Sequence, residues 1–225
     1  MGVLHVNKQS SFRPSTLTIS LVALYLVLIV ASAILVPYLP ERFPIHFGLG
    51  GEPDGFTSPL IGALFQPVNG LVILVLVSAV PYWGRHATKR AEFYRSTFPI
   101  IQILVAAFPI VMQAYILVRA LGVWGGQVNP VSLAAVVPLV LAPLLPRTPR
   151  NGLFGVRTPW SLKDDETWRK SQILGARLFA ASGGIALLGF AFPAAAFWLL
   201  IVPIVLSAII LIPYSRAIYL VGRSE

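Results

Sequence analysis

Long, mainly apolar runs alternate with polar segments along the whole chain. The first run covers residues 17–36, which is about the 20 residues that a helix needs to cross the hydrocarbon core of a bilayer. The pattern as a whole predicts an all-α, polytopic membrane protein. We expect six spans, at residues 17–36, 66–82, 97–121, 131–145, 173–192 and 194–212.

The fourth run is the least regular of the six. Asn129 and Pro130 form a good helix start, with the amide as N-cap and the proline in the first turn. Pro138 and Pro143 then interrupt the apolar run, because proline lacks the N–H that a helix interior needs. We therefore expect a span that is short, kinked or not fully crossing.

The first run has an alternative interpretation as a cleaved leader, because Ala31-Ser32-Ala33 resembles a signal-peptidase site. The apolar run continues through Val36, however, whereas the hydrophobic region of a leader normally stops before its cleavage site. This favours a membrane-spanning helix.

Composition agrees with a membrane protein. The chain has 225 residues, of which 56% are hydrophobic and 11% charged, so a polar shell cannot cover it in water. We expect a single membrane domain, residues 1–225, made of 1–66 (first span and outer loop), 67–145 (spans two to four) and 146–225 (inner loop and last two spans). The absence of cysteine excludes disulfides, thiolate metal sites and cysteine nucleophiles.

The positive charge is distributed unevenly along the chain. The net charge is +9, and all but two of the 17 lysines and arginines, Arg42 and Arg119, fall on one side of a six-span layout. Because basic loops are retained in the cytoplasm, this predicts a plasma-membrane protein with both termini cytoplasmic. The excess charge faces anionic lipid, so no nucleic-acid partner is expected.

The outer loop, residues 39–56, gathers groups that bind hard metals or transfer protons. Their spacing matches no zinc motif, and Glu-Pro-Asp-Gly at 52–55 is a good turn by itself. A turn-and-packing role and a ligand role therefore both stay open, and no metal is assigned. The candidate outer-loop residues are His46, Gly51, Glu52, Asp54 and Gly55.

The inner loop, residues 146–170, carries the signals of a helix start. Residues 161–164 fit a capping box, and acidic residues follow where a helix N-terminus favours negative charge. The pairs Asp165/Arg169 and Glu166/Lys170 are four residues apart. We expect a short interfacial helix leading into the fifth span.

Aromatic and basic side chains in this loop suit a membrane surface. Trp160 and Trp168 are suited to the headgroup region, and the arginines to lipid phosphates or a cytoplasmic partner. Arg157, between Gly155 and the turn at 158–159, is expected to hold the loop through backbone carbonyls. The candidate inner-loop residues are Asn151, Phe154, Gly155, Arg157, Thr158, Pro159, Trp160 and Trp168.

Two segments carry a family resemblance. Residues 151–162, NGLFGVRTPWSL, followed by WRKSQ at 168–172 and by Gly175, resemble the signature loop of the SdpI family of bacterial membrane immunity proteins. Residues 39–46 and GEPDG at 51–55 resemble a short membrane domain of unknown function, DUF1648. Gln172 stands where histidine is common in the family.

The resemblance implies protection of the producing cell against a secreted, membrane-active peptide toxin. Some members also couple toxin sensing to a cytoplasmic transcriptional repressor. The partners it implies are therefore the lipid bilayer, a peptide outside and a protein regulator inside, with no cofactor and no catalytic activity.

Two other classes of function remain open. A transporter is suggested by a faint three-plus-three inverted repeat, although the spans hold no Asp, Glu, Lys or His, leaving Asn69, Gln102 and Gln113 as interior polar groups. A membrane enzyme would use the outer His, Glu and Asp with Arg42, or Arg157 with the acids that follow it. No recognised nucleophile–base pair or metal-binding helix motif accompanies either set.

Overall fold

The computed structural model describes residues 14–83, 97–123, 128–152 and 154–223, and six of its helical segments are long and apolar enough to cross a membrane. This confirms the all-α, polytopic fold. The long helices are α1 (Thr16–Leu35), α2 (Pro59–Trp83), α4 (Phe98–Ala120), α6 (Asp165–Leu187) and α7 (Ala196–Val221). The fourth span is composite, with η2 (Pro130–Ala135), α5 (Val136–Leu141) and η3 (Ala142–Arg147).

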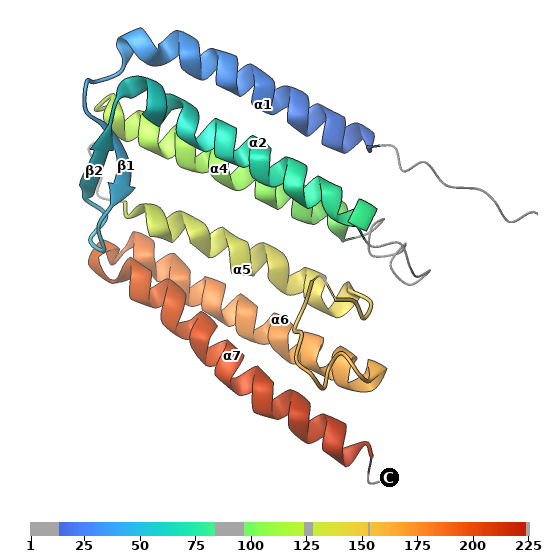
Figure 1. Ribbon diagram of the computed structural model, residues 1–225. Helices are drawn as coiled ribbons and strands as arrows, with labels where there is room; N and C mark the ends of the chain where they lie inside the picture. Colours follow the sequence, from blue (N-terminus) through green and yellow to red (C-terminus); the bar gives the residue numbers. More distant parts are fainter. Residues whose placement is uncertain (1–13, 84–96, 124–127, 153, 224–225) are drawn as a thin grey trace, which may run out of the picture.

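The helices form two groups of three (Figure 1). In the first group α2 packs against both α1 and α4, and in the second group α6 packs against both the fourth span and α7. Among the described helices, the contact between the groups runs mainly from α4 to η2. The grouping is three plus three, while an inverted relation between the halves stays a prediction.

Polar side chains join the helices of the first group. Tyr25 on α1 is fully buried and donates a hydrogen bond of 2.6 Å to the Ala106 carbonyl on α4. Gln102 on α4 is also buried, and its amide donates to the hydroxyls of Thr18 on α1 (3.0 Å) and Ser78 on α2 (2.9 Å). One side chain therefore links all three helices. Its amide finds hydrogen-bond partners on the neighbouring helices, which lipid tails cannot provide.

Gln113 compensates for a proline on the neighbouring helix. Pro67 in α2 has no N–H, so the carbonyl of Ala63 lacks its normal helical partner. The amide of Gln113 on α4 donates to that carbonyl at 3.2 Å. The interior amides Gln102 and Gln113 thus hold helices together, and Asn69 bonds the Phe65 carbonyl of its own helix.

Several predicted boundaries were wrong. The second span begins at Pro59 rather than at residue 66, and the last helix continues to Val221 rather than ending at 212. The expected interfacial helix and the fifth span are one continuous helix that begins at Asp165. Hydrophobicity marks the lipid-facing part of a helix, whereas the hydrogen-bonded helix extends beyond that part. The irregular fourth span is confirmed.

The two loops lie at opposite ends of the bundle (Figure 1). A two-stranded hairpin, β1 (Phe43–Phe47) and β2 (Pro53–Thr57), lies at one end, near the C-terminal end of α4. The loop before α6, the start of α1 and the C-terminal end of α7 lie at the other. We call these the hairpin end and the loop end. Lys8, Arg13 and the basic stretch 85–95 lie outside the described residues.

Candidate functional site

The outer loop folds into an antiparallel hairpin that the sequence pattern did not predict. Phe43 pairs with Thr57 and His46 with Gly55, with irregular register between them. A side chain at position 55 would place its Cβ 2.7 Å from the Cβ of His46, so the strand needs glycine there. Gly51, at the tip, has a φ of +88°, which favours glycine as well.

Apolar contacts seat the hairpin on the bundle. Phe43 is fully buried and clusters with Tyr115 and Ile116 of α4. Its ring lies where the Cβ of residue 62 would be, so Gly62 in α2 makes room for it. Phe47 adds a ring contact to Tyr115 with centroids 5.7 Å apart. The hairpin is therefore a fixed part of the structure rather than a free loop.

Asn129 joins three segments at the hairpin end. Its Oδ1 accepts from the Val131 N–H (3.0 Å), which confirms the predicted helix cap. Its Nδ2 donates to the Leu49 carbonyl of the hairpin tip and to the Pro193 carbonyl between α6 and α7, both at 2.8 Å. The side chain is fully buried. The cap was predictable from Asn129-Pro130, whereas no local pattern indicated the two long-range bonds.

The ionisable residues of the outer loop do not converge. His46 Nδ1 lies 2.5 Å from Asp54 Oδ1, and the two side chains are 72% and 53% exposed. Glu52 instead approaches Arg119 at 3.9 Å, and Arg42 stacks on the Phe56 ring at 4.5 Å. Within the described residues no three His, Cys, Asp or Glu side chains are grouped as metal ligands. The outer loop therefore presents one exposed His–Asp pair.

The inner loop is fixed to α6 by a buried amide. The Oε1 of Gln172 accepts from the Val156 N–H (2.9 Å), and its Nε2 donates to the Val156 carbonyl (3.2 Å). Gly155 has a φ of +116°, and a Cβ there would lie 2.8 Å from Gln172 Oε1. Gln172 was not among the residues predicted for the site. Its position four residues after Trp168, on the same helix face, was the available signal.

Trp168 is a buried structural residue and not a headgroup anchor. Its side chain is 4% exposed, and the indole N–H donates to the Thr148 carbonyl at 2.9 Å. The Thr148 hydroxyl in turn donates to the Leu144 carbonyl at 2.8 Å. The predicted headgroup position was wrong because the loop covers this face of α6. Trp160 is half-buried.

The helix cap lies three residues later than predicted. Ser161 and Thr158 form a small turn in which each side-chain oxygen accepts from the other's N–H, at 2.9 and 3.1 Å. The N-cap of α6 is Asp164, whose Oδ2 accepts from the Thr167 N–H at 2.6 Å. This hydrogen bond holds the pKa of the Asp164 carboxyl below its ordinary value.

The acidic residues after the cap are paired within the loop end. Asp165 forms an ion pair with Arg150 at 2.6 Å, so the predicted pairing with Arg169 was wrong. Glu166 pairs with Arg169 (2.7 Å) and, as predicted, with Lys170 (3.3 Å). Arg150 also donates to the Leu162 carbonyl at 2.8 Å. The Arg150–Asp165 pair fastens the loop to the first turn of α6, whereas the Glu166 pairs lie within the helix.

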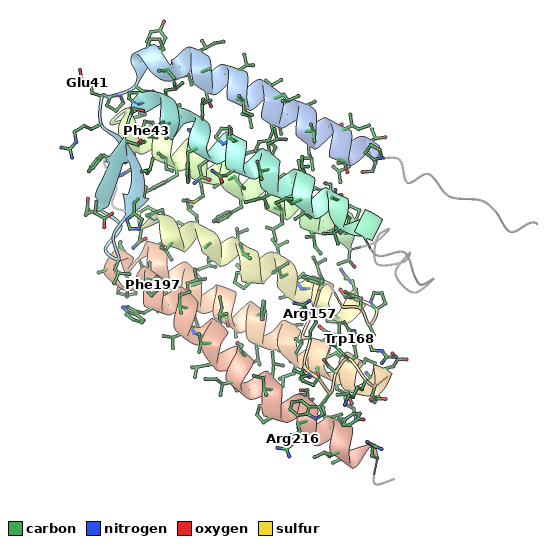
Figure 2. The ribbon with its side chains drawn as sticks, viewed as in Figure 1. Glu41, Phe43, Arg157, Trp168, Phe197 and Arg216 are labelled. Carbon is green, nitrogen blue, oxygen red and sulfur yellow. The ribbon has the colours of Figure 1, made fainter. Side chains whose placement is uncertain are left out.

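Arg157 binds a backbone carbonyl, as the sequence indicated. Its guanidinium donates to the Gly152 carbonyl at 2.6 Å while the residue stays exposed. Asn151 forms the adjoining turn, because its Oδ1 accepts from the Phe154 N–H and its Nδ2 donates to the Pro149 carbonyl, both at 2.8 Å. Figure 2 shows Arg157 and Trp168 at the loop end.

The candidate inner-loop residues therefore divide into two kinds. Asn151, Thr158 and Trp168 are buried and bonded within the loop, whereas Arg157 and Pro159 are exposed. Phe154, Gly155, Arg157 and Thr158 also line a groove of about 430 Å³ between the fourth span, α6 and α7. The loop closes the inner end of this groove.

Models of known protein families match the two segments that contain the loops. The model of the SdpI/YfhL protein family matches residues 147–215, and that of the domain of unknown function DUF1648 matches residues 23–71. The chain is 26% identical over 161 residues to Immunity protein SdpI of Bacillus subtilis (strain 168), covering 71% of this chain and 74% of that protein. No solved structure matches the chain significantly. The resemblance seen in the sequence is thus confirmed: this six-span protein carries a segment that matches the SdpI/YfhL family and a preceding segment that matches DUF1648.

Proposed function

We propose that this protein protects the cell that makes it against a secreted, membrane-active peptide toxin, without catalysing a reaction. The observation that carries the proposal is the similarity to an immunity protein over 71% of the chain and 74% of the relative. That similarity spans most of a six-helix membrane architecture rather than a single short motif.

The proposed orientation places the hairpin end outside the plasma membrane and both termini in the cytoplasm. Arg42 and Arg119 lie at the hairpin end. The six-span layout places the other 15 of the 17 lysines and arginines on the opposite side of the membrane. Basic segments near membrane spans are retained in the cytoplasm, which supports this orientation. The hairpin then faces the side from which a secreted peptide arrives.

The proposed contact with the peptide is the hairpin. Its backbone is seated by the buried Phe43 and Asn129, while His46 and Asp54 are exposed and paired. A rigid element with an exposed polar pair is a suitable recognition surface, because little conformational entropy is lost when it binds. Any coupling to a cytoplasmic regulator would use the loop end, where the exposed basic residues lie.

Survival of toxin-sensitive bacteria during challenge with such a peptide tests the proposal. Cells that express the wild-type chain are expected to survive, and cells that express His46→Ala to lose most of that protection at equal membrane abundance. Glu41→Ala is the matched control, because Glu41 is exposed at the same end (Figure 2) and lies outside the His–Asp pair. Absence of protection by the wild-type chain would contradict the proposed function.

A further inference from the structure

We propose that the groove at the loop end binds one anionic phospholipid of the inner leaflet, with an acyl chain between the helices and the phosphate on Arg157. This site is separate from the outer hairpin. It goes beyond protection against a peptide, since it assigns a lipid ligand to the inner half of the second helix group.

The groove is elongated along α7, as the binding of a single acyl chain requires. On α7 it is lined by side chains at positions 204, 208, 211 and 212, which fall on one face of the helix. From residue 204 to 212 the helix rises by roughly 12 Å. Leu141 and Leu145 of the fourth span form the opposite wall, Phe179 of α6 lies between them, and one side is open. The walls are therefore apolar along their whole length.

Gly175 allows the walls and the loop to converge. A Cβ at this position would lie 2.6 Å from the Val156 side chain, 3.5 Å from Leu145 and 3.8 Å from Leu211. These three neighbours belong to the loop, the fourth span and α7, and all three line the groove. The small residue on α6 thus lets these three groove-lining side chains approach one another.

The charge of the groove lies at one end. Arg157 is the single ionisable side chain among its lining residues, and it lies at the inner end with the loop. A guanidinium has five N–H donors, and the Gly152 carbonyl accepts from one nitrogen only in the contact described. The remaining donors suit an oxyanion such as phosphate, which guanidinium groups bind in a bidentate manner.

Neighbouring carboxylates do not neutralise this arginine. Among the described residues of the loop end, Asp164 caps α6, Asp165 pairs with Arg150, and Glu166 pairs with Arg169 and Lys170. The positive charge at one end of an apolar groove therefore favours an anion attached to an apolar chain. In the proposed orientation, an inner-leaflet phospholipid has its head and its chains in this same order along the membrane normal.

The test is native mass spectrometry of the purified full-length chain in detergent, titrated with phosphatidylglycerol, phosphatidylcholine or oleate. We expect one tightly bound phosphatidylglycerol, bound more strongly than either other lipid. Arg157→Gln should weaken phosphatidylglycerol binding about fivefold. Arg157→Lys should weaken it less, because the ammonium keeps the charge but cannot bind the phosphate in a bidentate manner. Arg177→Gln, an exposed cation on the opposite face of α6 from Gly175 and Phe179, is the charge-matched control and should bind as the wild type does.

A second variant fills the groove without changing any charge. Ala208→Trp places an indole where the chain is proposed to lie, and should abolish the tightly bound lipid. Ala217→Trp, which is exposed on the other side of α7, should leave it bound. Equal retention by Ala208→Trp and the wild type, stronger binding of oleate than of phosphatidylglycerol, or an equal loss in Arg177→Gln and Arg157→Gln would each overturn the proposal. None of these outcomes depends on toxin protection.

Discussion

The hairpin and the inner loop contain similar residues and use them in opposite ways. Both combine one glycine in a left-handed conformation with prolines and charged side chains. In the hairpin the ionisable side chains are exposed, and apolar contacts from Phe43 hold the backbone. In the inner loop the uncharged side chains of Asn151, Thr158 and Ser161 are buried and themselves hold the backbone.

The hairpin therefore exposes polar side chains to possible partners, whereas the inner loop uses them to hold its own backbone in place. Buried polar groups in the inner loop form a hydrogen-bond network, so removal of one group leaves another without a partner. The exposed His–Asp pair of the hairpin contributes little to stability, since solvent screens it. Substitutions in the inner loop should therefore be read first as changes in folding, and substitutions of His46 or Asp54 as changes in function.

The largest expected effect is that of Gly155→Val in the inner loop. The φ of +116° disfavours a β-branched residue, and the added Cβ would clash with Gln172 Oε1. We expect a loss of roughly 3 kcal/mol in the free energy of unfolding, measured by denaturation in detergent. Gly152→Ala, where an added Cβ meets open space, is the control and should change stability little.

Asn129→Ala should have the next largest effect, at the hairpin end. It leaves the carbonyls of Leu49 and Pro193 without this donor and removes the cap of η2, which we expect to cost about 2 kcal/mol. Limited proteolysis at the hairpin should then accelerate. Asn69→Ala, which loses a bond within its own helix, should not accelerate it; equal acceleration would remove Asn129 from its joining role.

Trp168→Phe should cost about 1 kcal/mol, because the ring still fills the site while the Thr148 carbonyl loses its donor. The same change at the half-buried Trp160 should cost less. Chemical denaturation of both purified variants checks this difference. A larger effect at Trp160 would mean that the loop is held elsewhere.

Asp164→Ala should cost about 1 kcal/mol through loss of the helix cap, with a defined pH dependence. The pKa of the folded carboxyl is lowered, so its stabilisation is present above the ordinary pKa and is lost as the pH falls through the folded value. The stability difference between variant and wild type should be constant near neutral pH and shrink below roughly pH 4. A difference that persists at low pH would contradict the cap.

The sequence predicted those features that depend on local or one-dimensional patterns. Apolar runs identified the spans, and the spacing around Arg157 indicated its carbonyl bond. The hairpin was missed because its strands are five residues long and each contains a proline. Trp168 was misplaced, and the long-range bonds of Asn129 were missed, because both depend on segments distant in the chain.

Thermal unfolding of His46→Ala and Gln172→Leu in one detergent compares the two regions most directly. Gln172→Leu leaves the Val156 N–H without its partner, so we predict a loss of about 2 kcal/mol and a Tm lower by roughly 4–8 °C. For His46→Ala we predict a Tm within about 2 °C of the wild type. A larger fall for His46→Ala than for Gln172→Leu would contradict the division between an exposed recognition hairpin and a hydrogen-bonded inner loop.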